Sequence, residues 1–145
     1  MVTSQNILYS TSAIARLLNV AASAVVKFDV FAKVIWVYIK GQRPRFLSKK
    51  LFTQHFVDRR KSEAQNLQAI KASMVGGYVV RNPLKDSQYV VTPMRDRIEC
   101  ACEDYKNQVR FFGRGCCKHG YAVLAQLGYT DLRSYLEAQQ WQKSS

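Results

Sequence analysis

The chain has 145 residues, of which 48% are hydrophobic and 22% are charged, a balance that excludes a disordered protein and is typical of a folded globular one. Lys and Arg number 22 against 10 Asp and Glu, so the formal net charge is +12 and the isoelectric point is near 9.8. This excess is larger than solubility requires of a chain this size. It predicts a polyanionic partner, with nucleic acid first and an anionic membrane surface second.

The sequence carries no pattern for export or membrane insertion. Residues 1–12 lack the basic start and apolar core of a signal peptide. The most apolar run, residues 34–39, is bounded by Lys33 and Lys40 and is too short to span a bilayer. We therefore expect a cytoplasmic protein, nucleoid-associated if bacterial, with no membrane partner and with reduced thiols.

The first predicted elements are two short helices. Ser10 or Thr11 can cap a helix whose apolar stripe includes Ile14 and Leu17. A turn follows at Asn19, a residue type that tolerates the left-handed backbone conformation. The apolar segment over residues 23–31 is interpreted as the second helix.

Two strands and a long helix are predicted next. Residues 34–39 are β-branched and aromatic and predict a strand, residues 41–44 predict a turn, and residues 45–47 predict a returning strand. Ser48 can cap a helix over residues 49 to about 68. The segment from Lys40 to Lys71 holds nine Lys or Arg and two acids, so over half of the net charge lies in the middle of the chain.

The run IARLLNVAASAVVKF, followed by two strands with a basic turn, resembles the small bacterial winged helix-turn-helix. The resemblance implies DNA binding, with the basic turn as the wing. The second helix offers few polar side chains for reading base edges, so two ordinary core helices are the alternative. The candidate nucleic-acid contacts are Lys27, Lys40, Arg43, Arg45, Lys49, Lys50, Arg59, Arg60 and Lys61.

The second half opens after a break at Gly76 and Gly77. Residues 78–80 and 89–91 predict two strands, and residues 109–112 predict a further strand. Residues 131–142 predict a final helix with Thr130 as its cap.

All four cysteines of the chain lie within residues 100–117, and one of its two histidines follows at position 119. Cys100 and Cys102 form one pair, Cys117 and His119 form another, and fourteen residues separate the pairs. Thiolate and imidazole are the ligands of structural zinc, and four of them close a tetrahedron without leaving a position open for chemistry. The spacing therefore predicts a structural zinc site at Cys100, Cys102, Cys117 and His119.

A disulfide framework, a catalytic pair and a different choice of ligand are the alternatives to this zinc site. A disulfide framework belongs to secreted chains, which nothing in the sequence suggests. A catalytic Cys–His pair needs an adjacent base and an orienting group, and the tight CxH spacing suits a shared metal better. Cys116 lies next to Cys117, so Cys116 with His119 is an alternative ligand pair.

The pattern CxC, a loop, and CxH leading into a short helix over residues 120–127 resembles the SWIM zinc finger. The resemblance covers about a third of the chain, from residue 89 to Leu127. It assigns the ligand positions to Cys117 rather than Cys116, and it implies that Ala122, Val123 and Leu127 pack the helix on its hairpin. The family is associated with both DNA binding and protein–protein contact.

Together these observations predict an α+β protein with a winged-helix-like basic module at residues 8–65. A SWIM-type zinc module with a C-terminal helix is expected at residues 76–145. The expected function is non-enzymatic DNA binding, mainly through phosphate contacts, in a regulator or an accessory factor of DNA transactions. The alternative is an adaptor that binds protein or RNA through the zinc module. Paired carboxylates, a phosphate-cradling glycine loop and an open metal site were not found in the sequence.

Overall fold

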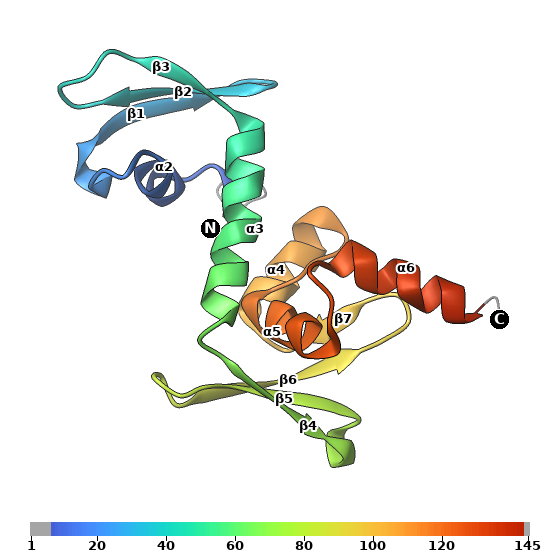
Figure 1. Cartoon of the computed structure of the whole chain (residues 1–145). Helices are drawn as coiled ribbons and strands as arrows, with labels where there is room; N and C mark the ends of the chain where they lie inside the picture. Colours follow the sequence, from blue (N-terminus) through green and yellow to red (C-terminus); the bar gives the residue numbers. More distant parts are fainter. Residues whose placement is uncertain (1–6, 144–145) are drawn as a thin grey trace. The chain divides into compact units, whose positions relative to one another are not determined.

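The computed structural model describes residues 7–143 (Figure 1). The chain divides into two compact units, residues 1–59 and residues 60–145. Each unit has its own antiparallel sheet, three-stranded in the first and four-stranded in the second. The protein is thus α+β, as the sequence predicts.

The first unit begins with helix α2 (Thr11–Leu18). The Ser10 hydroxyl oxygen accepts a hydrogen bond from the Ala13 N–H at 3.0 Å, which confirms the predicted cap. Asn19 ends the helix with φ 55° and ψ 48°, the left-handed conformation expected of it.

The predicted second helix over residues 23–31 is wrong. A short 3₁₀ turn, η1 (Ala22–Ala24), leads into strand β1 (Val25–Val30). Three of the six residues of β1 are valine, whose branched Cβ favours a strand, and a short apolar run does not reveal its period. Residues 19–48 contain no α-helix, so this unit lacks the second helix of a helix-turn-helix.

Strands β2 (Val34–Ile39) and β3 (Arg45–Ser48) confirm the two strands predicted there. They complete an antiparallel sheet in the order β1-β2-β3. One face of the sheet packs on α2 (Figure 1). Its core consists of Ile35, Val37, Ile39 and Leu47 together with Ile14 and Phe52, all buried. On the opposite face, the side chains of Tyr38 and Phe46 are exposed.

Helix α3 (Lys49–Ala64) follows β3, and the Ser48 hydroxyl accepts a hydrogen bond from the Lys50 N–H at 3.2 Å. The helix ends four residues earlier than predicted because Gln68 begins strand β4 (Gln68–Ala72). Its last turn belongs to the second unit, where Ala64 is part of the core.

The second unit contains an antiparallel meander of β4, β5 (Gly77–Asn82), β6 (Ser87–Pro93) and β7 (Ile98–Cys100). The strands predicted at residues 78–80 and 89–91 are confirmed and pair with each other. Helices α4 (Glu103–Phe112), α5 (Lys118–Leu127) and α6 (Leu132–Lys143) complete the unit (Figure 1).

The strand predicted at residues 109–112 is wrong, because these residues form the last turn of α4. Glu103 and Asp104 in the first turn favour the helix electrostatically, and Gly113 ends it at φ 80°. These local signals outweigh the β-propensity of Val109 and the two phenylalanines that follow.

Two further predictions about helices need correction. In α5, Ala122 and Val123 are buried as expected, but Leu127 is 37% exposed and Leu124 is buried instead. In α6, Asp131 rather than Thr130 caps the helix, since its Oδ1 accepts a 2.7 Å hydrogen bond from the Ser134 N–H. None of the helices within residues 7–143 is long and apolar enough to cross a bilayer.

Candidate metal centre

Four buried side chains of the second unit converge on one point. The sulfurs of Cys100, Cys102 and Cys117 and a ring nitrogen of His119 all lie within 4.8 Å of one another. His119 Nδ1 is 3.8 Å from Cys100 Sγ and 3.7 Å from Cys117 Sγ. These are the four residues that the sequence spacing selects.

The secondary structure delivers each donor. Cys100 ends β7, Cys102 is the N-cap of α4, Cys117 is the N-cap of α5, and His119 lies in the first turn of α5. Cys102 Sγ accepts the Tyr105 N–H and Cys117 Sγ accepts the Gly120 N–H, each at 3.4 Å. Two helix N-termini therefore point at two sulfurs, which favours the thiolate form that binds metals.

The spacing of the donors fits a tetrahedral metal ion. Zn–S bonds of about 2.3 Å and Zn–N bonds of about 2.0 Å place ligand sulfur and nitrogen about 3.5 Å apart in a tetrahedron. The two observed sulfur–nitrogen distances, 3.8 and 3.7 Å, are close to that value. Three sulfurs and one imidazole are also a donor set that structural zinc sites use.

The protonation of the cluster also favours a cation. The pKa of Cys102 is lowered well below that of an ordinary thiol, because Cys100 and Cys117 hydrogen-bond to its sulfur. The contact with Cys102 raises the pKa of Cys100 to about 11, and contacts with Cys100 and Cys102 raise the pKa of Cys117 further. Three sulfurs this close cannot all be thiolates on their own, and a divalent cation supplies the compensating charge.

Cys116 is not part of this cluster. Its thiol is buried, and burial raises its pKa to about 12, so it stays protonated as a small apolar group. A side-chain carbon added at Gly120 would lie 3.1 Å from Cys116 Sγ, so glycine makes room for this thiol beside the centre. The structure thus favours Cys117 over Cys116 as the ligand.

Gln108 holds the segment that carries Cys117, a role that the sequence did not suggest. This buried side chain accepts a hydrogen bond from the Cys116 N–H at 2.9 Å and donates to the Cys116 carbonyl at 3.2 Å. A side-chain carbon at Gly115 would lie 2.5 Å from Gln108 Cβ, so only glycine permits this approach.

The support continues to the end of α3. Gln108 also donates to Asp104 Oδ2 at 3.0 Å. Asp104 in turn accepts two hydrogen bonds from Arg60, at 2.9 and 2.8 Å. Arg60, whose side chain is 14% exposed, is therefore engaged in a bidentate ion pair rather than presented to solvent.

The other basic residues singled out from the sequence lie in several places. Lys27 is on β1, Lys40 and Arg43 are in the β2–β3 connection, and Arg45 begins β3; all four are exposed. On α3, Lys50 and Arg59 are exposed, whereas the Lys49 amine lies 5.0 Å from the centre of the Tyr9 ring. In the second unit, the Lys61 amine lies 5.8 Å from the centre of the Tyr121 ring.

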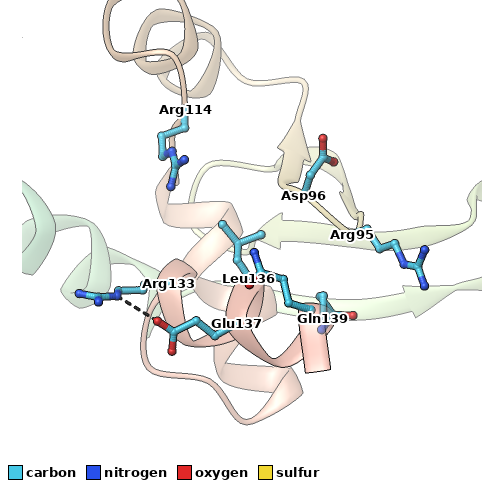
Figure 2. Close-up of a pocket in the computed structure, with 8 residues that line it drawn as sticks. Arg95, Asp96, Arg114, Arg133, Leu136, Glu137 and Gln139 are labelled. Carbon is cyan, nitrogen blue, oxygen red and sulfur yellow. Dashed lines mark hydrogen bonds and ion pairs between the residues drawn. The ribbon is translucent and has the colours of Figure 1, made fainter. Parts of the chain in front are cut away.

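Arginines also border a cavity elsewhere in the second unit, but their side chains do not point toward one another. Arg95, Arg114 and Arg133 line a cavity of about 520 Å³ beside α6. Figure 2 shows Arg133 turned toward Glu137, with which it forms a 3.1 Å ion pair, and Arg95 extending in the opposite direction. These side chains do not form a common anion site.

Comparisons with protein-family models, with curated proteins and with solved structures found no significant match to this chain.

Proposed function

We propose that the second unit folds around one structural zinc ion and that the protein binds DNA. The convergence of four buried donors within 4.8 Å of one another is the observation that carries the first part. The resemblance of the CxCx14CxH pattern to the SWIM zinc finger supports the same assignment and selects zinc among the metals that thiolates bind.

Cys100, Cys102, Cys117 and His119 would hold the ion, which supplies binding free energy to the folded state. The centre joins the end of β7 to the starts of α4 and α5, so its ligands connect the sheet to two of the three helices. Since four protein donors complete a tetrahedron, the proposed role of the ion is structural, and the function that we propose is non-enzymatic. Reduced thiols and zinc are compatible with the cytoplasm.

The excess of positive charge supports the nucleic-acid part of the proposal. The exposed cations of the first unit include Lys27, Lys33, Lys40, Arg43, Arg45, Lys50 and Arg59. They lie on the three-stranded sheet, in the connections between its strands and on helix α3. Contacts between such side chains and phosphates give affinity for DNA without reading its sequence. We therefore expect binding dominated by the phosphate backbone.

A salt titration of DNA binding tests this proposal. If six phosphates are contacted, the logarithm of affinity should fall against the logarithm of salt concentration with a slope of about −5. Arg43→Ala with Arg45→Ala should weaken binding and make the slope shallower by about 2, whereas Lys85→Ala with Arg133→Ala, at exposed positions of the second unit, should change little. A slope near zero would contradict the DNA part and leave the zinc part standing.

One observation favours a second candidate, an adaptor that binds a protein through the zinc unit. Val109 and Phe112 lie on the same side of α4 and are 37% and 39% exposed. Zinc binding without any salt-dependent nucleic-acid binding would favour this candidate.

A further inference from the structure

The face of the first sheet that α2 does not cover carries aromatic side chains. Alternation along β2 turns Ile35, Val37 and Ile39 inward, so Trp36 and Tyr38 point to the opposite face. On β3, Phe46 lies opposite Trp36 in the register, and on β1, Lys27 lies opposite Tyr38. Four side chains of three adjacent strands thus form one surface.

This surface is open to solvent. Phe46 is 62% exposed and Tyr38 is 38% exposed, while Trp36 is half-buried among its neighbours. Phe31, just beyond β1, is 51% exposed, and its ring centre lies 6.3 Å from that of Phe46. Exposed aromatic rings gathered on one face are unusual on a surface that only meets water.

Positive charge surrounds the same face. Residues 25–48 contain five Lys or Arg and one acid, Asp29. Lys27 and the one acid, Asp29, both lie on the face itself, opposite Tyr38 and Trp36. Lys33 lies in the β1–β2 connection, and Lys40 and Arg43 lie in the β2–β3 connection, so the cations outnumber the acid around the face. A partner that fits must therefore combine flat apolar groups with a regular negative charge.

We propose that this face binds single-stranded DNA, with unpaired bases stacked on Phe46, Tyr38 and Phe31 and with phosphates placed near the surrounding cations. Stacking platforms bordered by basic side chains are the general device of single-strand binding, because every base offers a flat face. Trp36 and Tyr38, two residues apart on β2, have Cα atoms about 7 Å apart, a spacing that an extended single strand can match, and Phe46 lies beside Trp36 on the neighbouring strand. The inference rests on the proposed nucleic-acid function and names the form of the ligand.

A duplex cannot use the rings in this way, because its bases are already stacked and paired. Phosphate contact alone would treat single and double strands alike, apart from their charge density. The face therefore predicts a preference for single strands, which charge alone does not predict. A protein partner would have to present an acidic surface to the same cations. It would have no regular row of flat bases to stack on the aromatic rings.

Tryptophan fluorescence gives a direct readout at this surface. The chain has two tryptophans, so Trp141→Phe leaves Trp36 as the sole reporter. Oligothymidine of about 12 nucleotides would be titrated into the full-length, zinc-loaded protein, beside a duplex of equal length. We expect the single strand to quench Trp36 and to bind more tightly than the duplex.

Variants then test the rings. Tyr38→Leu and Phe46→Leu keep an apolar side chain but remove the aromatic face, and each should raise the dissociation constant for oligothymidine about tenfold. Tyr38→Phe and Phe46→Tyr keep a ring and should stay within about twofold of the parent. Phe112→Leu, at a position as exposed as Tyr38 but in the second unit, is the matched control and should bind as the parent does. Circular dichroism and zinc content would establish that each variant is folded.

The outcomes separate this inference from the proposed function. Equal binding of single strand and duplex, with both leucine variants unchanged, would overturn the stacking surface and leave phosphate-based DNA binding intact. Binding of neither nucleic acid would overturn both. Oligouridine that binds more than about tenfold tighter than oligothymidine would contradict the assignment to DNA.

Discussion

The side-chain amide of Gln108 bonds to both backbone polar groups of Cys116, the residue that precedes the proposed zinc ligand Cys117. Its oxygen accepts from the Cys116 N–H at 2.9 Å and its nitrogen donates to the Cys116 carbonyl at 3.2 Å. A buried side chain thus replaces the hydrogen bonds that a strand partner would otherwise supply to this segment. The position of the second ligand pair depends on it.

Gln108→Leu should destabilise the second unit. The substitution leaves a buried N–H and a buried carbonyl without their partner, which costs about 1–3 kcal/mol. Chemical denaturation of the zinc-loaded protein would measure the loss, and a chelator should remove zinc faster than from the parent. Gln126→Leu, at an exposed position of α5, should change the unfolding free energy by less than about 0.5 kcal/mol. Equal effects of the two substitutions would contradict the supporting role.

Arg60 and its neighbour Arg59 should respond differently to replacement by alanine. Arg60→Ala breaks the bidentate pair with Asp104, which is partly exposed, and should cost about 1–2 kcal/mol of unfolding free energy. Arg59→Ala should change stability little and weaken DNA binding instead. A double-mutant cycle with Asp104→Ala would measure the coupling. A coupling energy near zero would show that the pair does not stabilise the unit.

Replacement of the two adjacent cysteines distinguishes the ligand. Cys117→Ala should reduce zinc from one ion per chain to a small fraction of that, because only three donors remain. Cys116→Ala should retain one zinc per chain, since its buried thiol stays protonated. Elemental analysis after dialysis against a mild chelator measures both. Loss of zinc from the Cys116 variant and retention by the Cys117 variant would reverse the assignment.

Tyr135 predicts a pH dependence of stability. Its hydroxyl donates a 2.7 Å hydrogen bond to the Met94 carbonyl, and burial raises its pKa above the usual 10. The protonated form is therefore favoured by folding, so its stabilisation is complete below pH 10 and is lost as the pH rises through the higher folded-state pKa. Tyr135→Phe should cost about 1 kcal/mol at pH 7.

The deficit of the Tyr135→Phe variant should shrink in alkaline solution, where the parent also loses the hydrogen bond. The difference in unfolding free energy between the parent and the variant, measured from about pH 7 to 11, would show this decrease. Tyr129→Phe is the control, because the Tyr129 ring packs edge-on against Tyr135 at 5.5 Å but remains present in the variant. A deficit that stays constant across this range would contradict the account.

The candidate metal centre could be predicted because the prediction depends on which residue types occur and how they are spaced, not on the secondary structure that they adopt. Cys100, Cys102, Cys117 and His119 are rare residue types at short spacing, and this holds whatever secondary structure connects them. The loop between the pairs was predicted as a strand at residues 109–112 and is instead the end of α4. Donor identity and spacing were therefore enough to find the site, but not its scaffold.

The first unit was harder to predict for the opposite reason. Residues 25–30 are a short apolar run without a clear period, and pairing with β2 makes them a strand rather than a helix. The contact between Gln108 and Cys116 bridges the end of α4 and the segment after it, and the ion pair between Arg60 and Asp104 joins residues 44 positions apart. Such contacts follow from tertiary packing, which propensities and spacing do not contain.

X-ray absorption at the zinc edge of the purified protein tests the central claim most directly, because it reports the donors of the bound ion. The account predicts three sulfurs at about 2.3 Å and one nitrogen at about 2.0 Å, with one zinc per chain. In Cys116→Ala the same spectrum should be retained. A shell with a water oxygen in place of a protein donor, or a protein that binds no zinc, would contradict a closed structural centre formed by Cys100, Cys102, Cys117 and His119.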